Sequence, residues 1–189
     1  MRAVIALALA AVITFSADHS ATFGLVVFGS FGVVTGAMIA LAAVVSVERG
    51  VSRGIRIAQG AITFVAGLAA LLVLGGGLPY FVFLVSVWAA ITGFLELYLG
   101  LRLRRAETGA RDSIFVGALT ALFAIAVLLV PPGYTQDYTV QDFQGQLTAS
   151  IIVVGLLGAY FAILGVYLVI AGLSLKWSTD ARTSAVTSA

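Results

Sequence analysis

Three helix-length apolar segments of the chain carry small residues at intervals of seven positions. Residues seven apart lie about two turns apart on one face of a helix. Side chains this small let two helix backbones approach closely, which is how helices associate within lipid. The pattern therefore predicts a bundle of transmembrane helices. The three sets are Gly29, Gly36 and Ala43; Ser86, Gly93 and Gly100; and Gly158, Gly165 and Gly172.

The composition fits a membrane protein better than a soluble domain. Of the 189 residues, 61% are hydrophobic and only 10% are charged, whereas soluble domains carry about 25% charged residues. A globule of this size cannot bury so much apolar surface, because its surface is large relative to its volume. Lipid is the solvent that suits such a chain.

Several kinds of chemistry are excluded by the residues that the sequence lacks. The chain has no cysteine and one histidine, His19, so it offers no disulfide, no thiolate site and no zinc site built from imidazoles within one chain. It lacks the set of nucleophile, base and orienting residue that hydrolases use. Its basic residues flank apolar segments and form no continuous patch for nucleic acid. We therefore expect no enzymatic activity, catalytic residues, cofactor, metal or nucleic-acid partner.

Six apolar segments have the length of helices. A helix needs about 20 residues, within a range of about 17–25, to cross the hydrocarbon core. The first segment is short, because it spans about 20 Å against a core of about 30 Å. We predict an all-α, polytopic membrane protein with six transmembrane helices. The segments are 3–15, 22–47, 57–74, 81–101, 114–130 and 150–175.

The arginines and lysines predict how the helices are oriented. If the N-terminus is cytoplasmic, six spans place all ten basic residues on the cytoplasmic side, and the outer side keeps Asp18, His19, Asp137 and Asp142. This asymmetry follows the positive-inside rule. We therefore predict a multi-pass protein of the bacterial inner membrane with both termini in the cytoplasm. The basic residues are Arg2, Arg49, Arg53, Arg56, Arg102, Arg104, Arg105, Arg111, Lys176 and Arg182.

The small-residue sets align as an internal repeat. When Gly36, Gly93 and Gly165 are aligned, an aromatic residue lies five positions before each glycine. We call the spacing from Gly36 to Gly93 the short repeat interval and the spacing from Gly93 to Gly165 the long repeat interval. Two-helix units with periods of this size indicate repeated hairpins, although abundant Gly, Ala and Ser could also produce such sets by chance.

The repeat predicts the domain organisation. We predict one transmembrane domain, 1–177, made of tandem helical hairpins over about 1–50, 51–107 and 108–177. The Ser-, Thr- and Ala-rich tail, 178–189, is predicted to be disordered.

The first segment has a second interpretation. Met1 and Arg2 followed by a 13-residue apolar stretch also fit a secretory signal peptide, and cleavage would leave five spans in the same orientation. A start codon assigned too late would also explain the short segment. We favour a retained helix, because the best cleavage region, 14–16, is poor and because the repeat requires this segment as the partner of the second.

The middle of the chain resembles a known family. Arg53 and Gly54 lead into Gly60 and Gly67, and the string Trp88-Ala-Ala-Ile-Thr-Gly93-Phe-Leu-Glu96-Leu leads into a basic close at 102–105. With the third-copy string Gly158-Ala-Tyr-Phe-Ala-Ile-Leu-Gly165-Val-Tyr, these motifs are similar to those of the HdeD-like membrane proteins. The resemblance implies a six-helix bacterial inner-membrane protein of three hairpins, whose molecular activity is undefined. It also implies a role in stress tolerance, because the founding member is associated with acid resistance.

Glu96 is the one acidic residue within an apolar segment. It lies three residues after Gly93 and four before Gly100, so it shares the face of the small residues and should point into the bundle. Gln59 on the antiparallel neighbouring segment lies at a similar depth, and Arg56 lies one turn nearer the cytoplasm. Because an acid within hydrocarbon is costly, we predict a structural pair of Glu96 with Arg56 or Gln59. A proton-accepting or ligand-binding site and simple snorkelling are the alternatives.

The outer connections and the arginines offer weaker candidates. An exposed His19 titrates near pH 6.5 and could sense acid, although a solvated loop residue is the simpler interpretation. Segment 131–149 is predicted to be a loop after Pro131, and its tyrosines either anchor the interface or form a docking surface. The cytoplasmic arginines are expected to attract anionic lipid headgroups.

No set of residues fixes the molecular activity. We expect a non-enzymatic membrane protein with a role in stress or acid tolerance, the latter by resemblance alone. A small transporter or proton-linked channel subunit, with Glu96 in its path, is one alternative. An accessory subunit of a larger membrane complex, docked through its glycine faces and its outer loop, is the other. A homo-oligomer is also compatible with the glycine faces.

Overall fold

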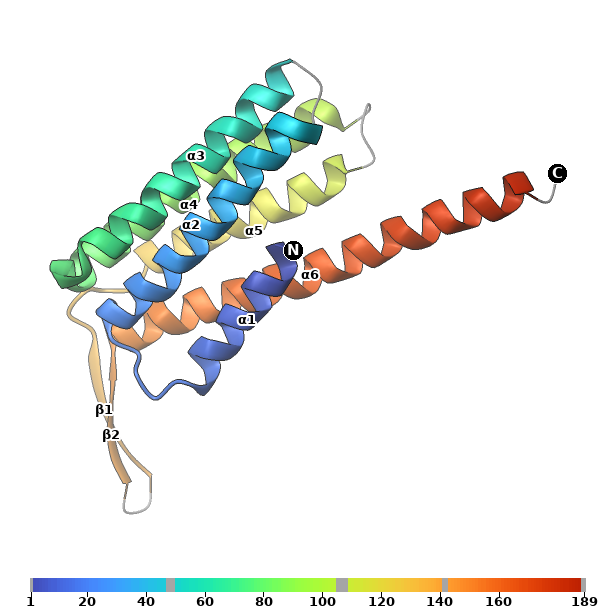
Figure 1. Cartoon of the computed structure of the whole chain (residues 1–189). Coiled ribbons are helices and arrows are strands. Elements are labelled where there is room, and N and C mark those ends of the chain that lie inside the picture. Colours follow the sequence, from blue (N-terminus) through green and yellow to red (C-terminus); the bar gives the residue numbers. More distant parts are fainter. Residues whose placement is uncertain (1, 47–49, 105–108, 141–142, 188–189) are drawn as a thin grey trace.

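The computed structural model describes residues 2–46, 50–104, 109–140 and 143–187, and these are mostly helical (Figure 1). A short 3₁₀ turn, η1 (Leu74–Gly76), joins the third and fourth helices, and a hairpin of β1 (Thr135–Val140) and β2 (Phe143–Thr148) precedes the last helix. The helices in the described residues are α1 (Arg2–Phe15), α2 (Ala21–Ser46), α3 (Val51–Leu72), α4 (Gly77–Leu103), α5 (Ala110–Leu128) and α6 (Ala149–Thr187).

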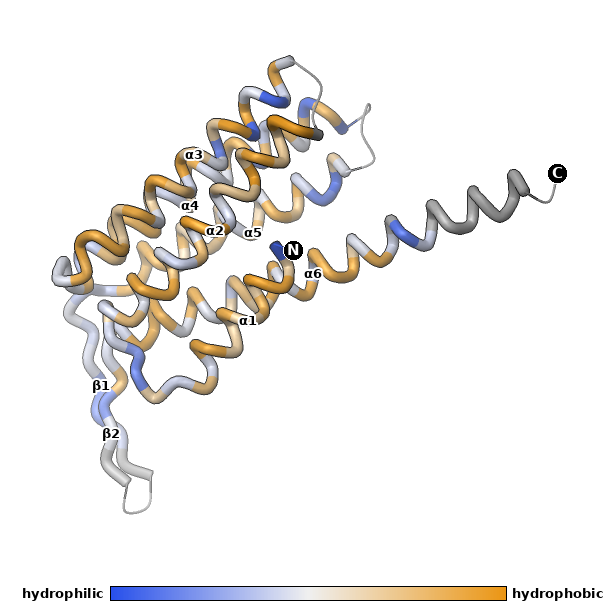
Figure 2. The backbone as a smooth tube through the Cα atoms, in the orientation of Figure 1, coloured by the Kyte–Doolittle hydropathy of each residue, from blue (hydrophilic) through white to orange (hydrophobic). Residues whose placement is uncertain are grey.

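The helices carry apolar surface on their outer as well as their inner faces. Among the described residues, α2 to α6 are each long and apolar enough to cross a membrane, whereas α1 is a shorter apolar helix. Apolar residues dominate these helices along most of their length (Figure 2). Val45, Leu72 and Leu129 are about three-quarters exposed, which suits contact with lipid rather than water. The chain is therefore a multi-pass helical membrane protein, as the composition predicts.

Local signals set several helix ends. The Ser20 hydroxyl accepts the Phe23 backbone N–H at 3.1 Å and caps the start of α2. Gly77 connects η1 to α4 with φ +67°, a left-handed conformation that glycine adopts without steric cost. Pro131 and Pro132 follow the end of α5, where they prevent the helix from continuing.

The closest helix pairs are α2 with α3, α4 with α5, and α1 with α6. In Figure 1, α2 to α5 run side by side, and α1 lies along the first part of α6. The repeat requires the first segment as the partner of the second, but α1 packs chiefly along α6. The reason is that the small-residue face of α2 is already covered by α3, so α1 packs instead against the glycines of α6.

Glycines make the contacts between α2 and α3. A Cβ atom added at Gly60 would lie 2.6 Å from the Ala40 backbone nitrogen, and one added at Gly67 would lie 2.5 Å from the Val33 nitrogen. Gly29 lies against Leu71 and the carbonyl of Gly67. Because these neighbours are largely backbone atoms, only residues without a side chain allow this approach.

The contacts repeat at matched positions between the other helices. Gly36 lies against Gly60 and Phe64, and Gly93 lies against Gly117 and Ala121. Each residue of the second contact therefore follows its counterpart in the first by the short repeat interval. Gly100 continues the second contact against the backbone of Ala110 and Ile114.

The third small-residue set packs less tightly than the first two. Gly165 lies against Leu7, which precedes Phe64 by the short repeat interval, and Gly158 lies against the Ile13 side chain. Gly172 has no neighbour within 4 Å that an added Cβ would meet. The prediction of close packing therefore does not hold at Gly172, because α1 ends its contact with α6 before that turn.

Residues 135–140 and 143–148 form strands where the sequence predicts a loop. The two antiparallel strands pair Thr135 with Thr148 and Val140 with Phe143, and they extend beyond the ends of the helices (Figure 1). Thr, Tyr and Val side chains favour strands, and the two prolines before them end α5, so the loop prediction is wrong here. Asp142 lies outside the described residues.

The end of α6 also differs from the prediction. Its helix continues to Thr187, so the tail predicted to be disordered is helical as far as that residue, and 188–189 lie outside the described part. After Gly172 this stretch contains neither glycine nor proline. Extending an existing helix costs much less than nucleating one, which favours continuation despite the polar composition.

Candidate functional site

A buried polar cluster joins α1, α3 and α4. Glu96 of α4 is 8% exposed and Gln59 of α3 is 4% exposed. The Gln59 amide Nε2 donates a hydrogen bond to Glu96 Oε2, and Arg2 Nη1 of α1 lies 3.9 Å from Glu96 Oε1. Each carboxylate oxygen therefore has its own partner.

The cluster compensates a charge that is costly within a membrane. Arg102 lies six residues after Glu96, which places the carboxylate about 9 Å inside that end of α4. A buried carboxylate requires hydrogen bonds and a counter-charge, and Gln59 and Arg2 supply one of each. Arg56 lies three residues before Gln59 on α3 and is half-buried. The arrangement ties three helices together near their arginine-bearing ends.

A second buried layer pairs aromatic side chains with threonines. The Thr63 hydroxyl donates to the Gln59 carbonyl at 2.8 Å and accepts the Trp88 indole N–H at 3.1 Å. The Thr120 hydroxyl donates to the Val116 carbonyl at 2.7 Å and lies 3.0 Å from the Tyr160 hydroxyl. Because a threonine hydroxyl has one proton, Tyr160 is the donor to Thr120.

The two pairs occupy matched positions in the chain. Thr120 follows Thr63 by the short repeat interval, and Tyr160 follows Trp88 by the long one, so the pairs obey the same spacing as the aligned glycines. The corresponding residues of α1 and α2 are Ala6 and Phe31, both fully buried. Trp88 and Tyr160, which each carry a hydrogen-bonding atom, thus each face a threonine. Phe31 carries no such atom, and the position that corresponds to the threonine is Ala6.

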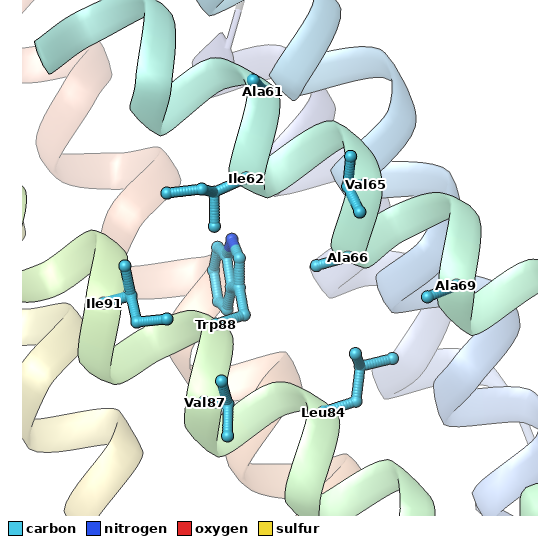
Figure 3. Close-up of a pocket in the computed structure, with 9 residues that line it drawn as sticks. All are labelled: Ala61, Ile62, Val65, Ala66, Ala69, Leu84, Val87, Trp88 and Ile91. Atoms are coloured by element: carbon cyan, nitrogen blue, oxygen red, sulfur yellow. The ribbon is translucent and has the colours of Figure 1, made fainter.

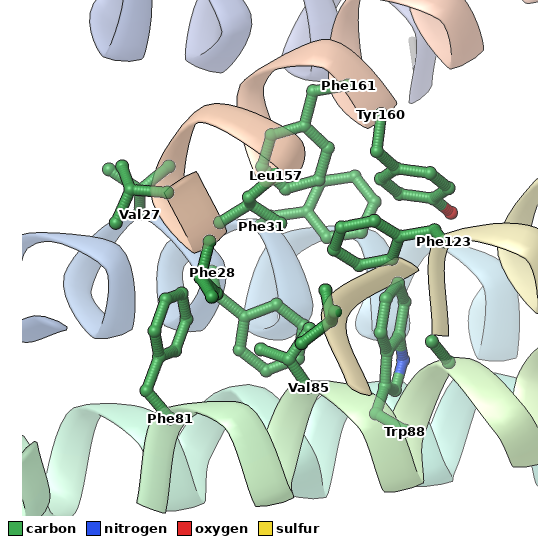
Figure 4. Packing of buried hydrophobic residues seen from close by; sticks show 14 of the residues in the cluster. Val27, Phe28, Phe31, Phe81, Val85, Trp88, Phe123, Leu157, Tyr160 and Phe161 are labelled. Carbon is green, nitrogen blue, oxygen red and sulfur yellow. The ribbon is translucent and has the colours of Figure 1, made fainter. Parts of the chain in front are cut away.

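Aromatic rings fill the centre of the bundle. The Trp88 ring centroid lies 6.1 Å from that of Phe31 and 6.2 Å from that of Tyr160, with both pairs edge-on. Phe161 packs against Phe31 at 4.5 Å, and Phe28 packs edge-on against Trp88. Figure 4 shows these rings converging from α2, α4 and α6, together with Phe123 of α5. The centre is therefore a packed apolar core. The Thr63 and Thr120 hydroxyls are hydrogen-bonded within it, whereas among the described residues the buried hydroxyls of Thr35 and Ser86 have no hydrogen-bond partner.

The structure places the other candidate residues at the ends of the helices. His19 lies in the α1–α2 connection, its ring 6.5 Å from that of Phe23. The Tyr134 hydroxyl donates to Gln136 Oε1 at 2.6 Å. Arg102 donates to the Tyr98 hydroxyl at 2.9 Å. These contacts are local and bring none of these residues to Glu96.

Sequence reasoning missed the role of Arg2. We treated it only as a charge that orients the first helix, yet it is an ion-pair partner of Glu96. A signal was available, because Arg2 precedes Gln59 by the short repeat interval. Extending the repeat alignment to the first helix places Arg2 at the position that corresponds to Gln59, which indicates that it lies at a similar depth.

Comparisons with known proteins leave the resemblance to HdeD-like proteins resting on sequence motifs alone. No protein-family model, curated protein or solved structure matches the chain. Within the described residues, no three His, Cys, Asp or Glu side chains are grouped so that they could hold a metal ion.

Proposed function

We propose that the chain is a non-enzymatic protein of the bacterial inner membrane, similar to the HdeD-like proteins, that contributes to stress or acid tolerance. In this proposal its six helices form three repeated hairpins with both termini in the cytoplasm. The observation that carries the non-transport part is the filled centre of the bundle, where Phe31, Trp88 and Tyr160 pack edge-on. The non-enzymatic part rests on the residue types of the sequence, which has no cysteine and one histidine. The stress role is carried by the resemblance.

Two sets of matched contacts support the repeat. Every residue of the Gly93 contact follows its counterpart in the Gly36 contact by the short repeat interval, and Leu7 extends the same spacing to α1. The aromatic and threonine pairs follow the two repeat intervals as well. In this arrangement the second helix of each hairpin packs on the first helix of the next, and α6 returns to α1. The three hairpins thereby form a closed ring.

The buried polar groups favour a structural role over a transport path. Transporters place several buried polar residues or broken helices near the midplane. Here the carboxylate of Glu96 is occupied by Gln59 and Arg2, and the deeper hydroxyls of Thr63 and Thr120 donate to backbone carbonyls of their own helices. The proposal therefore assigns Glu96 to holding α1, α3 and α4 together.

Reconstitution tests the non-transport part of the proposal. Purified protein in liposomes is placed across a pH gradient, and internal pH is followed with an entrapped dye. We expect no proton flux above that of empty liposomes, either for the natural chain or for Glu96→Gln. Flux in the natural chain that Glu96→Gln abolishes would establish the proton-linked alternative instead.

Acid survival tests the stress role separately. Cells that lack the gene are complemented with the natural chain or with an empty vector and then exposed to low external pH. We expect the natural chain to raise survival. Equal survival in both strains, at matched membrane levels of the protein, would remove the acid-tolerance proposal while leaving the membrane fold unaffected.

The β-hairpin favours an accessory subunit as a second candidate function. Its two strands pair only with each other among the described strands, and they extend beyond the helices (Figure 1). Unpaired strand edges are ready sites for another chain. Purification in mild detergent distinguishes the cases: a stoichiometric partner that deletion of 135–148 removes supports docking, and a protein that purifies alone argues against it.

A further inference from the structure

An apolar groove runs between α3 and α4 on the outside of the bundle. Its volume is about 360 Å³, within the range of small-molecule sites. Figure 3 shows Ala66 and Ala69 of α3 on one side, Leu84 and Val87 of α4 on the other, and the Trp88 indole between the helices. The indole N–H is occupied by Thr63, so a bound molecule would meet no free hydrogen-bonding group from these residues.

A second groove, between α5 and α6, is built from the corresponding residues. On its first helix, Leu119, Leu122 and Ala126 follow Ile62, Val65 and Ala69 by the short repeat interval. On its second helix, Leu156, Ala159 and Ile163 follow Leu84, Val87 and Ile91 by the long repeat interval. Tyr160 corresponds to Trp88 in the same way. The two grooves are therefore one structural feature that occurs twice.

The two grooves differ in one decisive residue. At the position of Ala66 the second groove has Phe123, whose ring stacks on Tyr160 with centroids 4.6 Å apart and planes 20° apart. That ring is 5% exposed, and the second groove measures only about 140 Å³. In α1 the corresponding residue is Leu9. Ala66 is thus the smallest of the three, and the space beside Trp88 lacks the side chain that fills the space beside Tyr160.

We propose that the groove between α3 and α4 binds an acyl chain of a bilayer phospholipid, which fills the space that Phe123 fills in the second groove. The lining offers dispersion contacts and no hydrogen bonds, which matches a hydrocarbon chain. An unfilled groove would forfeit those contacts along its whole lining. A chain lying along the helices can reach it sideways from the surrounding lipid, because Val65 and Val87 at its rim are exposed.

The depth of the groove indicates which leaflet supplies the chain. Trp88 lies about 16 Å along α4 from the start of that helix, and half of the hydrocarbon core is about 15 Å. Ala69 lies only three residues before the end of α3. The groove therefore runs from near the α3–α4 connection to about the midplane. The leaflet on the side of that connection supplies the chain, and the terminal half of the chain lies against Trp88.

Quenching of Trp88 fluorescence by brominated acyl chains tests the proposal. The chain has two tryptophans, so Trp177→Phe leaves Trp88 as the single emitter. The protein is reconstituted in phosphatidylcholine brominated at successive chain positions. We expect strong quenching even though Trp88 is only 3% exposed, with a maximum for bromines in the deep half of the chain.

Filling the groove from within the protein supplies the decisive comparison. In the same background, Ala66→Phe should lose most of the quenching, because its ring takes the place of the acyl chain. Ala58→Phe, at an exposed position of α3 outside the groove, should retain it. Circular dichroism and gel filtration establish that each variant is folded, and Ala66→Leu, which matches Leu9, replaces Ala66→Phe if that variant fails.

Three results would overturn the proposal. Quenching in the Trp177→Phe protein no stronger than that by a brominated detergent too short to reach the midplane would mean that no chain occupies the groove. Equal quenching in Ala66→Phe and Ala58→Phe would mean that lipid reaches Trp88 by another route. Quenching by a brominated sterol but not by brominated phospholipid would identify a different ligand and equally refute the acyl chain.

Discussion

The hydrogen bond between Tyr160 and Thr120 allows a clean test of the buried aromatic layer. Tyr160→Phe and Thr120→Val each remove one hydroxyl with almost no change of shape, so their combination isolates the bond. Both residues are 3% exposed, and their oxygen atoms lie 3.0 Å apart. Because Thr120 already donates to the Val116 carbonyl, the two single variants should not be equivalent.

The expected magnitudes follow from what each variant leaves behind. Thr120→Val leaves the Tyr160 O–H buried without an acceptor, which costs about 1–3 kcal/mol. Tyr160→Phe leaves Thr120 still bonded to the Val116 carbonyl, so we expect about 0.5 kcal/mol. The double variant resembles the Phe31 and Ala6 positions and leaves no orphan hydroxyl. It should therefore be less destabilised than Thr120→Val alone, with a coupling energy of about 1 kcal/mol, in the range measured for hydrogen bonds between membrane helices.

Reversible unfolding in mixed micelles, with SDS as the denaturant and helicity followed by circular dichroism, measures all four free energies. Thr120→Ser, which keeps the acceptor, is the matched control and should recover most of the loss. If the two single variants were equally destabilised and their effects simply added, the donor assignment and the matched role of Phe31 and Ala6 would both be wrong.

Three other predictions test the helix contacts, the polar cluster and the topology. Gly67→Ala should lower the free energy of unfolding by about 1–3 kcal/mol, because its Cβ would lie 2.5 Å from the Val33 nitrogen. The control Gly172→Ala should change it by less than about 0.5 kcal/mol. Equal effects of the two variants in the SDS titration would refute the packing argument. Gln59→Leu should lower the free energy of unfolding by about 1.5–3 kcal/mol, as expected for a buried hydrogen bond to a charge. Arg2→Met should lower it by only about 1 kcal/mol, because the ion pair of Arg2 is long and partly exposed. A reversed order in the same assay would contradict this interpretation of the cluster. Because the chain has no cysteine, Thr135→Cys and Gly54→Cys each introduce a single thiol. In intact spheroplasts an impermeant maleimide should label Thr135→Cys only. Labelling of Gly54→Cys would show that the orientation is the reverse of the one proposed.

The apolar helices and much of the polar cluster were predictable, because they depend on local sequence and on depth. Apolar length predicts α2 to α6 directly. Gln59 meets Glu96 because the two residues lie at similar depth on consecutive antiparallel helices. That argument needs only the helical rise and the position of the flanking arginines.

The partner of α1 and the strands were not predictable in the same way. The small-residue rule states which face packs, but it does not say which helix lies against it, so the pairing of α1 with α6 needed the whole arrangement. The hairpin of β1 and β2 has no strict alternation of apolar and polar residues, and its side chains at 135–138 are exposed rather than packed on a core. Its strands therefore lack the periodic signal that burial imposes.

Matched positions also separate what the fold requires from what it does not. Packing that recurs at the short and long repeat intervals explains why a residue is small or aromatic, but it cannot explain a residue that differs from its counterparts. Glu96 is one such residue, since Ile39 and Leu168 occupy the corresponding positions, and its partners Gln59 and Arg2 account for it structurally. Ala66 is the other. Phe123 shows that the same position of the fold accepts a ring stacked on the neighbouring Tyr160. The groove of about 360 Å³ that remains beside Trp88 is the space that the proposed acyl chain would fill.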